Sequence, residues 1–423
     1  MANNLDSNVT RQVARVFLEK FESSRVLTKT VNSQLLSGKF NPSSGSTVDF
    51  KRPHDYKTIR TSGGDISGST KSDIIAGKAT GTVQNYFTTA TEWGNLEEAI
   101  QLDQLDQILA PMAQRIVTDL EVDLAAYMQK NCNLHYGTPG TAIDAWGDVA
   151  GANALMESVG VPMEGNRYYV MNPFVSTALA NTQSGLASGD NMLVNTAWQN
   201  AQISRDFGGL RALTSSSLKS RTSSDAADRA GTLAADPTVT YVAHKDTMIQ
   251  NLSVTAFTAN AVVKAGDIVT ITGRNRLNIA TKEVMLDASG AAVLWSGVVT
   301  ADVTLGASGE GVLAVAGPAI YEATGAYNTV DSAPVTGDVV TILGAASATY
   351  QPAMFYHEQA FGIGTVKLPK LYSTDTIATT KDGFSIRVSK YSDGDANKQM
   401  VRFDLLPAYA TFNPFFAGQG YGV

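Results

Sequence analysis

The sequence predicts an α+β fold that is interrupted by an inserted all-β domain, and three observations lead to this prediction. A helix-period pattern of apolar residues fills 96–131, and a short apolar strand at 168–171 runs into a further helix. Near residue 220 the helical periodicity stops and short strands follow one another until about residue 350, where the mixed character returns. A chain of 423 residues has room for about two or three domains.

The N-terminal region predicts an amphipathic helix over residues 7–27. Its apolar face is formed by Val9, Val13, Val16, Phe17 and Phe21. Such a helix either docks as an arm on a partner or packs on its own domain, and the sequence favours neither alternative.

Residues 46–92 predict one long hairpin. The outgoing limb is STVDFKRPHDYKTIR and the returning limb is KATGTVQNYFTTATEW. The glycine- and serine-rich stretch between the limbs is too long for a tight turn. Because two strands alone are only marginally stable in water, a polar arm of this kind needs another surface to lie on.

The strongest helix signal lies around the stretch MAQRIVTDLEVDLAAYMQK. Apolar residues recur there at steps of four, namely Met112, Ile116, Leu120, Leu124 and Met128. Pro111 marks the start of this helix or a kink in it. Three acidic residues, Asp119, Glu121 and Asp123, are expected on a solvated or subunit-facing side of the helix, and we do not interpret them as paired catalytic acids.

A second helix is predicted over 144–158, followed by the strand Tyr168–Met171, which reads as buried on both faces. Asn172 is suited to cap the next helix, and Pro173 is suited to its first position. The stretch 167–180 contains no His, Cys or carboxylate, so we interpret this corner as packed scaffold and not as a ligand site.

The segment 231–350 predicts a barrel or sandwich. Its candidate strands are TVTYVA, DIVTITG, EVMLDAS, AVLWSGVV, GVLAVAG and DVVTILGA. It holds ten acidic and five basic residues, a net charge of −5, whereas the whole chain has a net charge of −7. This balance argues against a nucleic-acid reader, which carries basic patches.

The sequence offers no catalytic, cofactor-binding or metal site. The four histidines, His54, His135, His244 and His357, are far apart and have no ligand-type spacing. Asp393, Asp395 and Asn397 have calcium-loop spacing, but Lys398 stands where that loop needs Gly, so a turn is expected. The single cysteine, Cys132, excludes an internal disulfide framework, and we find neither a signal peptide nor an apolar run long enough to span a membrane.

This organisation resembles the major capsid proteins of tailed double-stranded DNA phages, in particular those of short-tailed enteric phages with an inserted β-barrel domain. The stretch NLEEAIQLDQLDQILAPMAQRIVTDLEVDLAAYM resembles the spine helix and its approach, and RYYVMNP resembles the central strand of the axial domain. VVKAGDIVTITG resembles the insert, YQPAMFYHEQAFGIGTVKLP the return to the axial domain, and MVRFDLLPAYATFNPFFAG the final strand. The resemblance covers nearly the whole chain in the family's order.

The resemblance implies the tailed-phage major capsid fold, with an N-arm, an extended hairpin loop, a spine helix with its β-sheet, and an axial domain. The implied divisions are 1–34 (N-terminal arm), 35–92 (extended hairpin loop), 93–138 (peripheral domain with spine helix), 139–222 (axial domain, first part), 223–349 (inserted β-barrel), 350–395 (axial domain, second part) and 396–423 (C-terminal strand of the peripheral domain). The implied function is structural and not enzymatic: hexamers and pentamers that close into an icosahedral T=7 shell.

The implied partners are further copies of the chain, a scaffolding protein during assembly, a portal protein, and packaged double-stranded DNA without sequence-specific contact. No cofactor and no membrane are expected, and assembly is expected in the cytoplasm of the bacterial host. Two alternatives stay open: a surface-layer or adhesin-like protein, against which the missing signal peptide counts, and an α/β enzyme with an inserted domain, against which the missing nucleophile–base pair counts.

Within this framework the outgoing limb of the hairpin carries the candidate inter-subunit contacts. They are Asp49, Lys51, Arg52, Asp55, Lys57 and Arg60. One interpretation is a solvated strand whose charges contribute little, because exposed ion pairs are worth about 0–1 kcal/mol. The other is that these charges meet opposite charges on an adjacent subunit and set the register of the arm.

Overall fold

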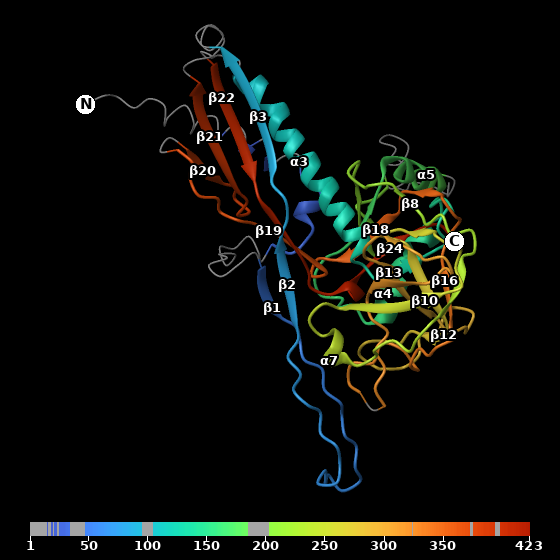
Figure 1. Cartoon of the computed structure of the whole chain (residues 1–423). Helices are drawn as coiled ribbons and strands as arrows, with labels where there is room; N and C mark the ends of the chain where they lie inside the picture. The colour runs from blue at the N-terminus through green and yellow to red at the C-terminus, as the bar shows by residue number, and fades with distance from the viewer. Residues whose placement is uncertain are drawn as a thin grey trace. The chain divides into compact units, whose positions relative to one another are not determined.

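The computed structural model describes residues 15, 18, 19, 21, 22, 25–33, 47–94, 105–184, 203–323, 325–372, 375–393 and 398–423. The chain divides into two compact units. The first contains residues 1–49, 80–125 and 361–411, and the second contains 50–79, 126–360 and 412–423. Figure 1 labels the elements.

One sheet of the first unit consists of four antiparallel strands in the order β20 (Thr376–Thr379), β21 (Ser385–Asp393), β22 (Lys398–Leu405) and β3 (Phe87–Gly94). Helix α3 (Leu105–Lys130) has 26 residues and is therefore about 39 Å long. It begins before Pro111, which lies inside it, so the interpretation of Pro111 as the helix start is wrong. The predicted apolar positions from Met112 to Leu124 are buried, as the spacing of four requires.

A second four-stranded sheet has the order β1 (Thr47–Lys51), β2 (Lys78–Val83), β23 (Pro407–Thr411) and β19 (Phe361–Thr365). The returning limb of the predicted hairpin thus divides, because β2 belongs to this sheet while β3 pairs with β22. The stretch MVRFDLLPAYATFNPFFAG, which resembles the family's final strand, likewise divides, because β22 and β23 are separate strands with Leu406 between them.

The second unit contains a six-stranded sheet in the order β4 (Leu134–Tyr136), β24 (Ala417–Gly420), β18 (Ala353–His357), β5 (Arg167–Met171), β7 (Leu210–Thr214) and β6 (Asp206–Phe207). The same unit contains helices α4 (Trp146–Val159) and α5 (Pro173–Ser184). The predicted corner is confirmed: Tyr169, Val170 and Met171 are fully buried, and Asn172 Oδ1 accepts a hydrogen bond from the N–H of Val175 at 2.8 Å.

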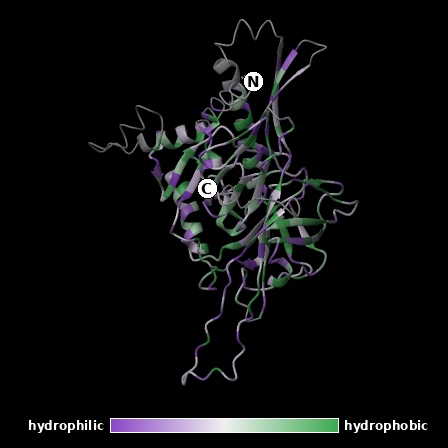
Figure 2. Cartoon of the chain, turned by 90° about the vertical axis from the view of Figure 1, so that its left-hand side faces the viewer, coloured by the Kyte–Doolittle hydropathy of each residue, from purple (hydrophilic) through white to green (hydrophobic). Residues whose placement is uncertain are grey.

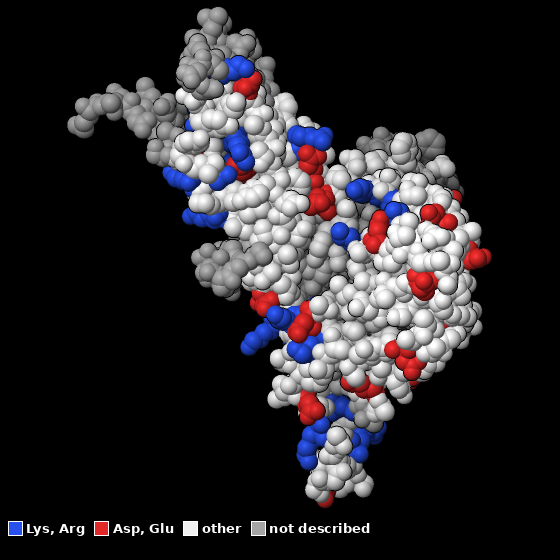
Figure 3. Space-filling view, viewed as in Figure 1, with Lys and Arg blue, Asp and Glu red and all other residues white. Residues whose placement is uncertain are grey.

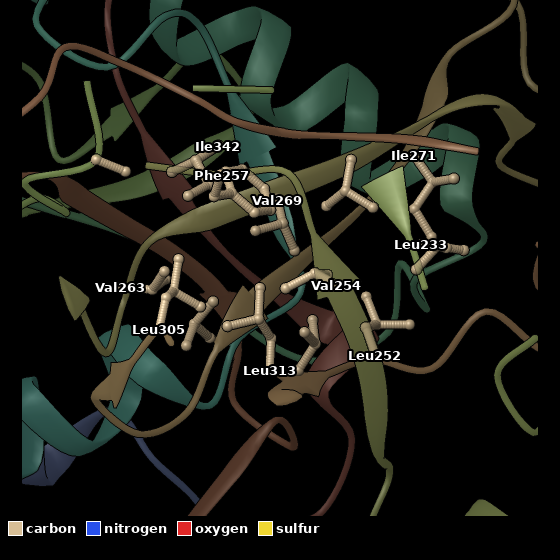
Figure 4. Packing of buried hydrophobic residues seen from close by; sticks show 14 of the residues in the cluster. Leu233, Leu252, Val254, Phe257, Val263, Val269, Ile271, Leu305, Leu313 and Ile342 are labelled. Atoms are coloured by element: carbon tan, nitrogen blue, oxygen red, sulfur yellow. The ribbon is translucent and has the colours of Figure 1, made fainter. Parts of the chain in front are cut away.

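The same unit contains a closed barrel of six antiparallel strands. They are β9 (Ala230–Leu233), β10 (Ile249–Thr255), β12 (Ile268–Asn275), β13 (Leu294–Val299), β15 (Gly311–Ala316) and β16 (Val339–Ile342), and β9 closes the ring on β10. Alternate residues point inward; for example, Leu252 of β10 faces Leu313 of β15 (Figure 4). Closure leaves no free sheet edge, and the predicted α+β class with an all-β barrel is confirmed.

Two of the candidate barrel strands were predicted wrongly. In TVTYVA, Tyr241–His244 forms the short helix α7, and in EVMLDAS only isolated bridges occur, such as Leu286 with Ala292. Two barrel strands, β9 and β10, were not predicted. The smaller elements are η1 (Leu27–Lys29), β8 (Arg221–Thr222), β11 (Val262–Val263), β14 (Val303–Thr304), β17 (Thr349–Tyr350) and η3 (Pro414–Phe416).

The segments that lead into and out of the barrel region pair with each other, since Thr222 of β8 faces Thr349 of β17. Directly beside this pair, the carboxylate of Asp267, which is fully buried, accepts hydrogen bonds from Arg221 Nη1 at 2.6 Å and from Ser223 Oγ at 2.9 Å. The chain therefore enters and leaves the barrel region at one point, which is fixed by a buried ion pair.

Candidate assembly interface

Residues 50–79 of the extended hairpin belong to the second unit and project from it (Figure 1). Residues 56–77 form no strand or helix. Purple and white dominate this hairpin in Figure 2, and Figure 3 shows Lys and Arg side chains gathered along it. A segment with so little apolar surface cannot build a core of its own, so its chemistry suits contact with another charged surface.

The first two candidate contacts lie on β1, and both are exposed. The carboxylate of Asp49 accepts a hydrogen bond from Thr80 Oγ1 at 2.6 Å, so one of its oxygens already has a partner in its own chain. Lys51 ends the strand.

Arg52 differs from the exposed charge that the sequence predicted. Its side chain is only 7% exposed, and its guanidinium donates from Nε to the carbonyl of Lys78 at 3.0 Å and from Nη1 to the carbonyl of Phe412. Burial lowers the pKa of Arg52 to about 10. The physical reason is strand alternation, because Val48, Phe50 and Arg52 share one side of the limb, where Phe50 packs edge-on against Phe412.

The remaining three candidates occupy the distal part of the outgoing limb. Asp55 is half-buried and forms an ion pair with Lys282 Nζ at 3.1 Å. Lys57 and Arg60 are exposed, and the N–H of Lys57 donates to Ser72 Oγ at 2.9 Å across the two limbs. Inter-subunit contact stays a prediction for all six residues, and exposure suits it for Asp49, Lys51, Lys57 and Arg60.

The N-terminal arm is described only in part. Arg15, Leu18, Glu19, Phe21 and Glu22 are helical, whereas the predicted positions Val9, Val13, Val16 and Phe17 lie outside the described residues. Phe21 is fully buried and packs edge-on against Phe384. The guanidinium of Arg25 lies 4.5 Å from the Phe384 ring centroid and forms an ion pair with Asp382. This part of the arm thus packs on its own unit.

Glu121 of α3 corrects another expectation. Instead of facing solvent, it is 2% exposed, and its Oε1 accepts hydrogen bonds from the N–H of Val26 and from the N–H and hydroxyl of Thr28, the latter two at 3.3 Å. Burial raises the pKa of Glu121 although these hydrogen bonds oppose the shift. Asp119 behaves closer to expectation, forming an exposed ion pair with Arg115 at 3.0 Å, and Asp123 is exposed.

Two of the four histidines, His244 and His357, have structural partners. The two ring nitrogens of His244 lie 2.9 Å and 2.7 Å from the carbonyls of Ile249 and Thr238, and His357 Nε2 lies 2.7 Å from the carbonyl of Glu164.

The other two histidines differ in their surroundings. Burial lowers the pKa of His135 to about 4, so this ring stays neutral near pH 7, and His54 is exposed. Burial also raises the pKa of the Cys132 thiol to about 12.

Across the residues that the structure describes, no three His, Cys, Asp or Glu side chains are grouped to hold a metal ion. The calcium-like spacing at Asp395 and Asn397 lies outside them. No helix in the described part of the chain has the length and apolar character needed to cross a membrane.

Comparison with known proteins identifies the family. A family model described as P22 coat protein, gene protein 5, matches residues 1–422. The major capsid protein of Acyrthosiphon pisum secondary endosymbiont phage 1 is 45% identical over 425 residues, a match that covers 100% of each chain.

Among solved structures, one from Mycobacterium phage Che8 has a TM-score of 0.48 at 12% identity and covers 93% of this chain and 90% of its own. The capsid structure of cyanophage P-SCSP1u has a TM-score of 0.41 at 10% identity and covers 90% and 84%. On the strength of the match over nearly its full length, this chain belongs to the P22 coat protein family, and it is a structural protein of a phage capsid shell and not an enzyme.

Proposed function

We propose that this protein assembles as hexamers and pentamers into a closed icosahedral shell of T=7 geometry that encloses phage double-stranded DNA. The observation that carries the proposal is the extended hairpin of a coat-family chain, whose distal residues are exposed and carry charges of mixed sign. The exposed distal part of such an arm gains burial by contact with a neighbouring subunit. A shell repeats each modest contact in every subunit, so the small contributions add up.

The same proposal assigns roles to the other parts of the chain. Residues 1–34 act as an arm, 35–92 as the extended loop, 93–138 and 396–423 as the peripheral domain, and 139–222 and 350–395 as the axial domain, into which 223–349 are inserted as a barrel domain. The partners are a scaffolding protein, a portal protein and DNA bound without sequence readout. The net charge of −7 of this chain supports weak contact with DNA, because the phosphates of DNA bind basic surfaces.

The experiment is expression of the full chain with the scaffolding protein of the same phage, followed by sedimentation and electron microscopy. We expect closed shells whose symmetry gives the triangulation number directly. A matched variant that replaces residues 58–72 by a short glycine-containing turn should stay folded and fail to close shells. A wild-type chain that remains monomeric with its scaffolding protein, or a hairpin-deleted chain that forms normal shells, would contradict the proposal.

A further inference from the structure

The outgoing limb of the extended hairpin is attached at its base to the barrel region of the same unit. The hydroxyl of Tyr327 accepts a hydrogen bond from the N–H of Asp55 at 3.0 Å. The carboxylate of Asp55 forms an ion pair with Lys282 Nζ at 3.1 Å. A backbone group and a side chain of one hairpin residue are therefore both held by residues that lie more than 200 positions away in the sequence.

The returning limb is attached in the same way. Asp246 Oδ1 accepts a hydrogen bond from the N–H of Lys78 at 3.2 Å, and Lys245 Nζ donates to the carbonyl of Ala76 at 3.2 Å. Gly77 lies between these two contacts, where an added Cβ would stand 2.7 Å from the carbonyl oxygen of Lys245. Glycine thus allows the limb to lie directly on the segment that follows α7.

An aromatic stack joins the two attachment points. The rings of Tyr241 and Tyr327 lie 3.7 Å apart between centroids with an interplanar angle of 2°, and Tyr241 is 3% exposed. Ile75 of the returning limb packs against the apolar cluster that contains Tyr241, Met248, Ile320 and Phe415. Polar and apolar contacts therefore fix both limbs on one small surface.

Beyond this surface the hairpin leaves the barrel region. The side chains of Tyr56 and Ile74, directly outside the attachment points, are 56% and 76% exposed. A pocket of about 540 Å³ is lined by residues of both limbs, such as Lys57 and Lys71, and by residues of the barrel region, such as Glu322 and Tyr327. On each limb, a side chain that is exposed lies within two positions of a residue that contacts the barrel region.

We propose that the inserted barrel is the mount of the extended hairpin of its own subunit, with Tyr327, Asp55 and Lys282 as the positioning residues that fix the direction in which the hairpin leaves. An arm that is already ordered before docking pays less conformational entropy when it binds. The inference rests on the proposed function only where it names a second copy of the chain as the partner of the tip, since the attachment itself is intramolecular.

The test uses the full-length monomer and the variant Tyr327→Phe, which removes a single hydroxyl and keeps the ring stack. Amide hydrogen exchange at Asp55 should become roughly fivefold to tenfold faster, as expected for one lost hydrogen bond. Exchange at Leu252 in the barrel core should not change. The matched control is Tyr321→Phe, because Tyr321 packs against the barrel core.

A charge exchange provides the second arm of the test. Asp55→Lys should accelerate amide exchange at position 55, relative to its intrinsic rate, and at Lys78, and it should reduce the yield of shells. The double variant with Lys282→Asp should restore both. Unchanged exchange in Tyr327→Phe and in Asp55→Lys would overturn the proposal, and so would faster exchange with a normal shell yield. If the wild-type chain forms no shells, the proposed function fails, while the exchange measurements still decide whether the barrel holds the hairpin.

Discussion

Arg276 and Asn133 meet in the interior of the second unit, where Nη1 of the guanidinium donates a 2.6 Å hydrogen bond to the side-chain oxygen of Asn133. Their exposed fractions are 3% and 0%, and burial lowers the pKa of Arg276 to about 9. The amide of Asn133 in turn donates to the carbonyl of Ser296 in β13 at 2.6 Å. Because Asn133 follows the end of α3, this pair ties the helix end to the barrel wall.

We expect Asn133→Ala to reduce the free energy of unfolding by about 2–3 kcal/mol. The substitution removes an acceptor from a buried guanidinium and a donor from a buried carbonyl, and an unsatisfied buried polar group costs about 1–3 kcal/mol. Urea denaturation of the monomer measures the change. Asn131→Ala is the matched control, because Asn131 lies two residues earlier and its side-chain amide donates to the carbonyl of Tyr127, four residues before it in α3. Equal losses in the two variants would show that the contact with Arg276 contributes nothing special.

A second prediction concerns the autonomy of the barrel. We expect a fragment of residues 219–352 to fold alone and to be about 3–5 kcal/mol more stable than 223–349. Only the longer fragment retains Arg221, and loss of this partner leaves the buried Asp267 carboxylate without its ion pair. Circular dichroism and thermal unfolding of both fragments decide the point. Arg221→Ala in the longer fragment should lower its stability to that of the shorter one; if it does not, the difference has another origin.

Glu121 leads to a prediction about pH. Its folded-state pKa is raised, so its protonated form stabilises the fold; this contribution is complete below the unfolded pKa of about 4.5 and is lost as the pH rises through the folded value. Glu121→Gln keeps a hydrogen-bond acceptor without the charge. It should therefore leave the free energy of unfolding at pH 7 unchanged or raise it, and it should remove the contribution of Glu121 to the pH dependence of stability. Glu121→Ala should cost about 1–3 kcal/mol, because the N–H groups of Val26 and Thr28 lose their acceptor. Chemical denaturation at pH 4.5 and pH 7 compares the three proteins, and a Gln variant as unstable as the Ala variant would contradict the argument.

The elements with a regular apolar period could be predicted from the sequence, and those fixed by distant partners could not. Helix α3 and the strands β12, β13, β15 and β16 follow their patterns. The strand β24 has the sequence AGQG and shows no pattern, yet Gly418 pairs with Phe355 and an added Cβ there would stand 2.3 Å from that ring. Close packing against a partner more than 60 residues away determines this strand.

The two corrected side chains did have a signal in the sequence. Glu121 lies four residues after Val117 and so continues a buried row of α3, and Arg52 continues the alternation of Val48 and Phe50. Their charge argued for exposure, but both find backbone partners: N–H groups for the carboxylate and carbonyls for the guanidinium. Only the fold brings those main-chain groups within reach.

The last prediction separates the exposed charges of the hairpin from the buried one. Arg60→Glu should leave the melting temperature of the monomer unchanged, because Arg60 is exposed. If Arg60 faces an acidic group on an adjacent subunit, the reversed charge repels that group. The yield of shells should then fall, most strongly at low salt, and recover partly at high salt, where the repulsion is screened.

Arg52→Glu is the contrasting variant, since it places a carboxylate against the carbonyls of Lys78 and Phe412. We expect a less stable hairpin base, and a defect that changes little with salt because the site is buried. Melting temperature and shell yield are measured for both variants at about 50 mM and 500 mM salt, chosen to span Debye lengths of roughly 14 Å to 4 Å. Normal shells from Arg60→Glu at both salt concentrations would show that Arg60 makes no contact in the assembly interface. A salt-sensitive shell yield of Arg52→Glu, with an unchanged melting temperature of the monomer, would show that Arg52 does make such a contact.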